Sequence, residues 1–495
     1  MGPNYAGGCS ILDTKLSVHP PPVGQFAAPA ADRKSAAQQD SCSHVRVSHY
    51  SASPFLLHRF WRRRSPRSSR PPPPSPSSPA DAVVPGQYIV VVRPDVTPEL
   101  VAADHAVTRK FTYHAVLNGF AGVVPPGQLA GLKADPRVQQ VVPDHIVQLI
   151  APVASEVGPT AKPGTGGGGG GGSGQVTPVG IQRIGAAPGS FIYTGAGVGV
   201  AIVDTGIDLN HADLAVQPAC FTAYSACQDD HGHGTHVAGT VAARNNAIDV
   251  VGVAPEAALY AVKVLDTSGS GSDASVIAGL DWVRTTVNTP AIRVANMSLG
   301  RPASATAADD QPMHDAIKAL TAAGVTIVVA AGNDASKEVQ AMVPARFPEV
   351  LAIASTTAAN GSSGACGSVA KDTASYFTTD GAFNTTTNVG VTVSAPGEDQ
   401  ENVKGCILQS VGILSTKLGG GTTRMSGTSM AAPHATGVVA LLQQKTPGIT
   451  AETVRSQLRS GADRVNTAPL NSPTSSDSFD GEQEGVLWAA GALNN

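Results

Sequence analysis

Three short motifs, far apart in the chain, supply a carboxylate, an imidazole and a hydroxyl in that order. Asp204 lies in Asp-Thr-Gly, His233 in His-Gly-Thr-His and Ser429 in Gly-Thr-Ser-Met-Ala. A serine hydroxyl is a weak nucleophile, so it needs a histidine that accepts its proton and a carboxylate that orients the histidine. Asp, His and Ser in this order are one known arrangement of such a triad. The motifs therefore predict a hydrolase with a serine nucleophile.

The residues around these motifs predict an α/β fold, a parallel sheet with helices on both faces. From Pro178 onward, short apolar runs typical of buried strands alternate with amphipathic helices. Asp204 and Asn333 each follow such a strand, so both are expected at one edge of the sheet, where ligands gather. Ser429 precedes a helix and is expected to act as its N-cap. The expected strands are residues 198–203, 258–265, 292–296 and 325–330, and the expected helices are residues 272–287, 309–323 and 430–444.

With their flanking residues, these motifs resemble the subtilisin-like serine peptidases. The resemblance runs from about Gln175 to the C-terminus, and the motifs follow the order typical of the family. It implies a doubly wound, mainly parallel sheet and an endopeptidase that forms an acyl-enzyme. The matching stretches are residues 203–208, 232–240, 296–300, 331–333 and 426–433.

The resemblance also implies roles for particular residues. It assigns the proton transfer to His233, whereas His236 is expected to be a structural neighbour. It assigns stabilisation of the oxyanion to the Asn333 side chain and the Ser429 backbone N–H, and one such donor is worth about 3–4 kcal/mol in subtilisin. Substrate is expected to bind as an added strand. The implied substrate-binding residues are Gly269, Ser270, Gly271, Ser298, Leu299, Gly300, Ala331 and Gly332.

A specificity pocket is expected around Ala331, Gly332 and residues 341–344. Met342 stands where relatives often carry a smaller residue, which limits the expected depth of the pocket. The predicted preference is therefore for medium apolar or aromatic side chains.

Catalysis by such a triad needs no cofactor, but the resemblance implies a structural Ca²⁺ ion. Residues 244–250 resemble the calcium-binding loop of the family, and the expected donors are all oxygen atoms, which Ca²⁺ prefers. A surface loop with Asn-Asn turn chemistry is the alternative. The expected ligands are the side chains of Gln175, Asp213 and Asn246 and the carbonyls of Arg244, Ile248 and Val250.

The chain divides into four expected regions. Residues 1–82 are basic and rich in Pro and Ser, residues 151–174 are a Gly-rich linker, and residues 175–495 form the catalytic domain. Residues 83–150 predict a small α+β domain, ferredoxin-like in its order of elements, that resembles the inhibitory propeptide of the same family. The resemblance implies a zymogen blocked by its own propeptide, and an unrelated ferredoxin-like module is the alternative. Its expected strands are residues 88–92, 118–124 and 138–142, and its expected helices are residues 98–105 and 126–134.

The N-terminal region does not show the pattern of a secretory signal, a basic stretch followed by an apolar core. Its Arg- and Ser-rich, acid-poor composition is typical of an organellar transit peptide, with a wrongly assigned start or a disordered tail as alternatives. We therefore expect a secreted or organellar protein. Processing is expected near Ile150, or alternatively near Gly174.

The composition limits the possible partners. A net charge of −4 over 495 residues argues against a nucleic-acid partner for the folded part. The sequence has no apolar run of about 18 residues or more, so it predicts no transmembrane helix. The expected partners are protein or peptide substrates and the chain's own propeptide, and the expected state is a monomer.

Four of the six cysteines lie in the expected catalytic domain. Cys220 and Cys227 flank a short loop before His233, and Cys366 and Cys406 would then close a longer loop. Two disulfides fit an oxidising compartment. Reduced, buried thiols are the alternative.

Other enzyme classes are excluded by what the motifs lack. Asp204-Thr205-Gly206 is also a signature of aspartic peptidases, but their chemistry needs two such carboxylates, and the sequence holds no second motif. A lipase-like hydrolase requires Gly-x-Ser-x-Gly, whereas Met430 and Ala431 follow Ser429. The alternative from another class is a catalytically silent peptide-binding pseudo-peptidase.

Overall fold

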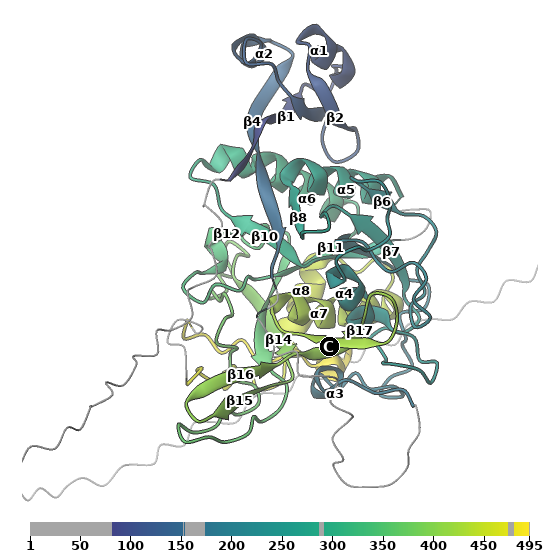
Figure 1. Ribbon diagram of the computed structural model, residues 1–495, viewed down its shortest axis with the longest axis vertical. Coiled ribbons are helices and arrows are strands. Elements are labelled where there is room, and N and C mark those ends of the chain that lie inside the picture. Colours follow the sequence, from purple (N-terminus) through teal and green to yellow (C-terminus); the bar gives the residue numbers. More distant parts are fainter. Residues whose placement is uncertain (1–81, 152, 154–173, 287–291, 474–479, 495) are drawn as a thin grey trace, which may run out of the picture. The chain divides into compact units, whose positions relative to one another are not determined.

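The residues that the structure describes form a central parallel sheet of seven strands. Some of its strands, such as β7, β11 and β14, are labelled in Figure 1. The computed structural model describes residues 82–151, 153, 174–286, 292–473 and 480–494. The strand order is β14-β13-β11-β9-β5-β7-β6, and every neighbouring pair is parallel. The predicted α/β fold is therefore confirmed. The strands are β5 (Gly199–Asp204), β6 (Phe221–Thr222), β7 (Ala258–Lys263), β9 (Ile292–Met297), β11 (Thr326–Ala330), β13 (Leu351–Thr357) and β14 (Val391–Glu398).

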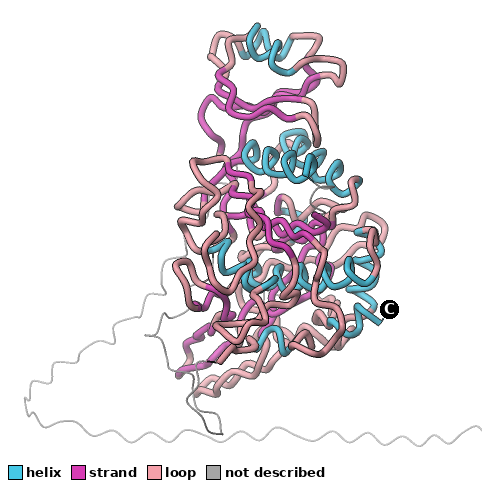
Figure 2. Tube along the Cα trace, turned by 90° about the vertical axis from the view of Figure 1, so that its right-hand side faces the viewer, coloured by secondary structure: helices cyan, strands magenta, loops and turns pink. Residues whose placement is uncertain are grey.

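Helices cover both faces of this sheet (Figure 2, helices cyan and strands magenta). Successive strand residues point to opposite faces, so Val200 and Ile202 of β5 belong to one apolar core and Ala201 and Val203 to the other. The first core contains side chains of α3 (Val179–Arg183), α4 (His233–Ala242), α7 (Thr428–Lys445), α8 (Ala451–Ser460) and α9 (Ala489–Asn494), and the second those of α5 (Asp273–Thr286) and α6 (Gln311–Ala322). Among the described residues, no helix is both long and apolar enough to cross a bilayer.

The start of α7 differs from the sequence-based expectation. Ser429 is not the N-cap but the second residue of the helix, which begins at Thr428 after Gly427. Gly427 has a φ of 153°, and a Cβ on it would lie 2.8 Å from Asn333 Nδ2. Glycine is required here because the backbone passes so close to that amide.

Residues 82–149 form an antiparallel α+β unit with an apolar core of its own. One strand of this unit was not predicted, and two are longer than predicted. One of the two begins at Val83 rather than at residue 88, and the other continues past residue 142 to Leu149. The second half of the strand that ends at Leu149 pairs with β8 (Ser270–Ser272) and β10 (Leu299–Pro302). β10 in turn pairs with β12 (Met342–Val343). The elements of the unit are β1 (Val83–Val92), α1 (Pro98–Asp104), β2 (Thr108–Tyr113, not predicted), β3 (Gly119–Val123), α2 (Leu129–Ala134) and β4 (Val138–Leu149).

Two short hairpins lie in sequence between β14 and α7. The first pairs β15 (Gln400–Lys404) with β16 (Ile407–Val411), and the second pairs β17 (Ile413–Thr416) with β18 (Thr422–Met425). Short 3₁₀ helices lie at Ala307–Asp310 and Val339–Ala341. The predicted basic N-terminal region, apart from residue 82, and most of the predicted linker lie outside the described residues.

Candidate active site

Asp204 and His233 meet at the carboxyl edge of the central sheet. Asp204 is the last residue of β5 and His233 the first residue of α4, and neither is exposed to solvent. The two carboxylate oxygens of Asp204 accept from His233 Nδ1 at 2.8 and 3.0 Å. Burial lowers the pKa of His233, but the charge and hydrogen bond of Asp204 outweigh it, and the pKa is raised. The ring is therefore oriented and a stronger base than an isolated buried imidazole.

Asp229 holds the start of α4, a role that the sequence analysis missed. Its carboxylate accepts from the N–H groups of Gly232 and Thr235, both at 2.9 Å. It also accepts at 2.9 Å from the hydroxyl of Thr205, the residue after Asp204. An acidic residue just before a helix is the available sequence signal, because it complements the free N–H groups there.

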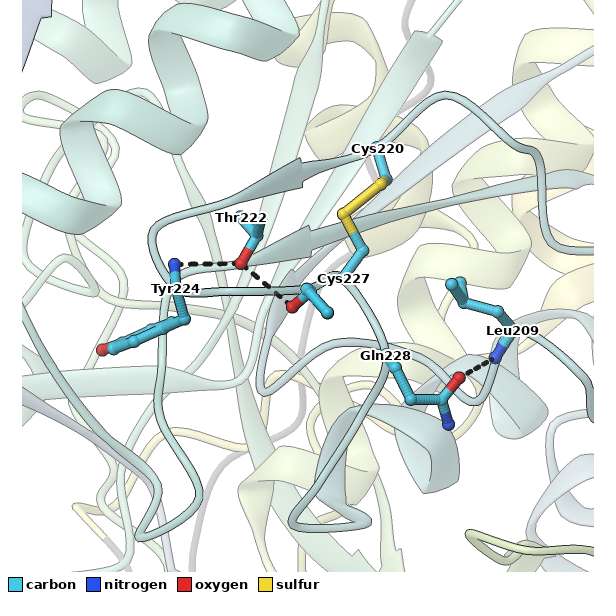
Figure 3. Close-up of a disulfide and its surroundings, with 7 residues drawn as sticks. Leu209, Cys220, Thr222, Tyr224, Cys227 and Gln228 are labelled. Carbon is cyan, nitrogen blue, oxygen red and sulfur yellow. Dashed lines mark hydrogen bonds between the residues drawn. A yellow bond between two sulfur atoms is a disulfide. The ribbon is translucent and has the colours of Figure 1, made fainter.

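Two disulfides join the expected cysteine pairs, Cys220–Cys227 and Cys366–Cys406. Figure 3 shows the first pair beside Thr222, whose hydroxyl donates to a backbone carbonyl of the same loop at 3.0 Å. This disulfide closes the loop that precedes α4. The described cysteines are therefore oxidised, as expected for an oxidising compartment.

Ser429 lies beside the end of β4 rather than in a hydrogen bond with His233. Its Oγ donates to the carbonyl of Ile150 at 2.9 Å and approaches the carbonyl of Ser298 at 3.3 Å. Within the described residues, His233 Nε2 is buried and has no hydrogen-bond partner. The hydroxyl is thus turned toward the chain of the N-terminal unit.

The Asn333 side chain is locked in one orientation at the end of β11. Its Oδ1 accepts from the N–H and the hydroxyl of Thr428, both at 2.9 Å. Its Nδ2 therefore faces the substrate side, where it donates to the carbonyl of Ala151 at 2.8 Å. That carbonyl lies one residue beyond the carbonyl that Ser429 contacts.

Six of the eight predicted substrate-binding residues line a groove that β4 fills. The groove lies between β8 and β10, with Gln148 opposite Ser270 on one side and opposite Gly300 on the other. At the end of β4, the Leu149 N–H donates to the Gly269 carbonyl at 2.8 Å. The predicted groove residues that lie along β4 are Gly269, Ser270, Gly271, Ser298, Leu299 and Gly300.

Of the other two predicted residues, Ala331 and Gly332, the second lies against Met342, another residue of the expected specificity pocket. A Cβ on Gly332 would meet Thr379 Oγ1 at 2.6 Å and Met342 Cε at 3.6 Å, so Met342 approaches this backbone. The Ile150 side chain lies against Gly300, where a Cβ would be 3.8 Å from its Cδ1. A β-branched aliphatic side chain therefore occupies this end of the groove.

The six residues predicted to supply calcium ligands are linked around one loop, where the Ile248 N–H donates to Asn246 Oδ1 at 3.1 Å. The Gln175 amide contacts the carbonyls of Arg244 and Val250 at 2.5 and 2.8 Å, and Asp213 Oδ2 accepts from Val250 N–H at 3.2 Å. Asn246 interacts with Asp213. Asp213 Oδ1 is buried and has no partner among the described residues. Burial raises the pKa of Asp213 to about 6. An orphaned carboxylate oxygen beside two carbonyls fits the donor set of a Ca²⁺ ion.

Comparison with known proteins places this chain in a family. Residues 195–481 match the subtilase family and residues 87–150 match the peptidase inhibitor I9 family. The chain belongs to the subtilase family and is a subtilisin-like serine endopeptidase, preceded by an inhibitor domain of the propeptide type.

Named relatives support the same assignment. The chain is 34% identical to subtilisin E of Bacillus subtilis (strain 168) over 72% of this chain and 77% of that protein. It is 37% identical to subtilisin Savinase of Lederbergia lenta over 60% of this chain and 95% of that protein. A solved structure of a cold adapted subtilisin-like serine proteinase matches with 29% identity and a TM-score of 0.45, covering 60% of this chain and 90% of that one.

Proposed function

We propose that this endopeptidase is made as a self-inhibited zymogen and acts through Asp204, His233 and Ser429. The observation that carries the proposal is the 2.9 Å contact between Ser429 Oγ and the carbonyl of Ile150. It puts the nucleophile beside one particular peptide bond of its own chain. The bond between Ile150 and Ala151 is therefore the proposed processing site, the first of the two positions that the sequence left open.

The first half of the reaction forms an acyl-enzyme. Ser429 Oγ attacks the scissile carbonyl carbon, and His233 Nε2 takes the hydroxyl proton and delivers it to the leaving amine. Asp204 supports this transfer because its hydrogen bonds to Nδ1 fix the tautomer in which Nε2 is the free base. A positive charge that develops on the ring is stabilised by the same carboxylate.

The negative oxygen of the intermediate requires donors that are already in place. Asn333 Nδ2 and the backbone N–H of Ser429 are the proposed donors. The Asn333 amide needs no reorganisation, because Thr428 holds its carbonyl end. During the attack, the Ile150 carbonyl has to reach Asn333 Nδ2. In the uncut chain, Nδ2 instead donates to the carbonyl of the next residue, Ala151. Water then hydrolyses the acyl-enzyme by the same route.

Residues 83–150 are the proposed inhibitor, and residues 175–495 the proposed catalytic domain. Asp281 of α5 accepts three backbone N–H groups of the inhibitor, from His114, Ala115 and Val116, at 2.7–3.1 Å. Asp144 of the inhibitor in turn accepts from the Ala274 N–H of α5 at 2.9 Å. These contacts support a unit that remains bound across the groove and excludes other substrates until it is removed.

The test is labelling with a fluorophosphonate, which reacts with activated serines. The purified full chain should label weakly at first, then strongly as a new N-terminus appears at Ala151. Tryptic mapping should place the label on Ser429. Cleavage at Ala151 without any labelling would favour the silent pseudo-peptidase instead.

We also propose a structural Ca²⁺ site formed by the side chains of Gln175, Asp213 and Asn246 and by backbone carbonyls of residues 244–250. Bound there, the ion would neutralise the buried Asp213 carboxylate and tie Gln175 to the loop. The Gln175 amide currently presents its nitrogen to two carbonyls, and a half-turn of the amide would present its oxygen to the ion. Ala247 and Asp249, with positive φ values of 69° and 45°, show how tightly this loop curls.

Removal of Ca²⁺ is expected to lower the thermal stability of the enzyme. At a free ion concentration of about 100 times the Kd, binding contributes about 2.7 kcal/mol, which corresponds to a melting temperature change of about 3 °C for a chain of this size. Differential scanning calorimetry of the uncleavable Ser429→Ala chain, with and without EGTA, measures this shift. The EGTA effect should vanish in Asp213→Asn, and an unchanged melting temperature in the parent would contradict the site.

We propose an oxidising location, either secreted or organellar. The support is the pair of disulfides within the described catalytic residues.

A further inference from the structure

A hairpin next to the nucleophile has no part in the mechanism described so far. β15 and β16 follow the end of β14 directly and precede β17, β18 and the turn that carries Ser429 (Figure 1). The Cys366–Cys406 disulfide joins the tip of this hairpin to a neighbouring loop. The hairpin is therefore held at both ends.

Two buried serine hydroxyls connect this hairpin to the nucleophile turn. Ser410 of β16 donates to Glu398 Oε2, and Ser410 Oγ lies 2.7 Å from Ser426 Oγ. A hydroxyl has one proton, so Ser426 is the donor in the second bond. Glu398 and Ser426 have no exposed surface, and Ser410 is 7% exposed. The chain of bonds thus runs Ser426 to Ser410 to Glu398 without water.

Glu398 is itself fixed by a second buried carboxyl group, Glu401 of β15. The two carboxyl groups are close enough to affect each other's pKa, and Glu401 Oε1 accepts from the Tyr376 N–H at 3.0 Å. Among the described residues, Glu398 Oε1 and Glu401 Oε2 have no donor. Ionised carboxylates only accept, so one proton shared by these two oxygens satisfies both. Glu398 is therefore an immobile acceptor for Ser410.

The backbone of Ser426 meets the chain on the far side of the proposed processing site. Its carbonyl accepts from the N–H of Val153 at 2.9 Å, and the two residues form an antiparallel bridge. Val153 is the third residue after Ile150, so it belongs to the segment that leaves when the bond is cut. The N–H of Gly427, the residue after Ser426, donates to the Gly397 carbonyl at 2.9 Å.

We propose that Glu398 and Ser410 are positioning residues for the leaving-group side of the substrate. They hold the Ser426 side chain so that the Ser426 carbonyl points at the N–H of a substrate residue beyond the cleaved bond. This inference rests on the proposed peptidase function. It assigns to the hairpin a role in binding the part of the substrate that is released first.

The test compares two substrate classes with Ser410→Ala in the processed enzyme. A peptide with at least four residues beyond the cleaved bond uses the Ser426 carbonyl, whereas a peptide p-nitroanilide has no amino acid there. We expect kcat/KM for the peptide to fall about three- to tenfold, the effect of one misplaced hydrogen bond, and that for the p-nitroanilide to change less than about twofold. An added tetrapeptide nucleophile should also capture the acyl-enzyme less well in this variant, by about the same factor as kcat/KM for the peptide falls.

Two matched variants serve as controls. Ser410→Thr keeps the hydroxyl and should restore the parent ratio between the two substrate classes. Ser394→Ala removes the same kind of bond from β14, because Ser394 Oγ donates to the buried Glu484 Oε1 at 2.5 Å. Ser394→Ala should lower the stability of the enzyme without changing the ratio of the kcat/KM values for the two substrate classes, since this hydrogen bond does not lead to Ser426.

Equal losses for both substrate classes in Ser410→Ala, or no loss in either, would overturn the proposal. If Ser410→Ala does not fold, Ser426→Ala cuts the same connection from the other side while keeping the backbone carbonyl, and it must show the same selective loss. Failure of the peptidase function itself is recognised separately, because the parent enzyme would then hydrolyse neither class.

Discussion

Ser429→Ala is expected to leave the chain uncut at Ile150–Ala151 and to lower peptide hydrolysis by about 10⁶-fold, the loss established for the nucleophile of the related subtilisin. The methyl group cannot form the acyl-enzyme. The oxyanion donors remain, but the attached inhibitor still fills the groove, so residual catalysis of about 10³–10⁴ over water should appear only after the inhibitor has been removed. Because the inhibitor stays attached, the purified variant should retain its full mass.

Intact mass and N-terminal sequencing measure the processing, and steady-state kinetics measure the hydrolysis. His233→Ala should match Ser429→Ala within about tenfold, because the members of a triad act as one unit. His231→Ala is the control, since His231 is an exposed neighbour whose ring centroid lies 6.3 Å from that of His233. Cleavage at Ala151 in purified Ser429→Ala, free of other proteases, would show that Ser429 is not the nucleophile.

The sequence was informative wherever a residue follows a buried strand. Apolar runs bounded by turn residues predict parallel strands, and the carboxyl ends of such strands share one edge. Asp204 at the end of β5 and Asn333 after β11 lie at that edge as expected. Of the strand boundaries predicted for the central sheet, none moves by more than about two residues, which is the usual uncertainty of element ends. Local pattern and global fold agree in this part of the chain.

The sequence was uninformative wherever a contact joins distant segments. β4 extends to Leu149 only because β8 and β10, far along the chain, supply its pairing partners. Ser429 turns toward Ile150 for the same reason. Ser410 does not stand out in the sequence, because a hydroxyl residue in a polar stretch has no period to identify it, and Asp229 is marked only by its place before a helix. Their roles depend on which backbone groups the fold brings within reach.

The Glu398–Glu401 pair shows how such a contact changes chemistry that the sequence cannot reveal. Burial raises the pKa of Glu401 to about 9, with Glu398 as the second cause, and burial also raises the pKa of Glu398. The charged neighbours on this side are Asp399 and Arg424, which form an ion pair with each other. An isolated glutamate in a hairpin sequence would be expected to ionise near its ordinary pKa of about 4.3.

Glu401→Gln is therefore expected to stabilise the protein at alkaline pH. Between the unfolded pKa of about 4.3 and the folded pKa, the folded state holds a proton that the unfolded state has released, so stability falls as pH rises. The parent should lose at most about 1.4 kcal/mol per pH unit through this group. Glutamine does not titrate, and its N–H₂ can donate to Glu398 Oε1 in place of the shared proton. The two proteins should be similar near pH 5 and diverge by several kcal/mol toward pH 9.

Guanidinium unfolding at a series of pH values, in the Ser429→Ala background to prevent self-digestion, measures the divergence. The contributions of other titrating groups cancel when the stability of the parent is subtracted from that of Glu401→Gln at each pH. The remaining difference is due to the Glu398–Glu401 pair. His236 and His434, whose pKa values burial lowers to about 3 and 4, impose the opposite slope below pH 6.5, but on both proteins equally. Asn402→Gln, a neutral change on the same strand, should shift stability by the same amount at every pH. Parallel curves for Glu401→Gln and its parent would mean that no proton is shared, and Glu398 and Glu401 would then both be ionised although both are buried.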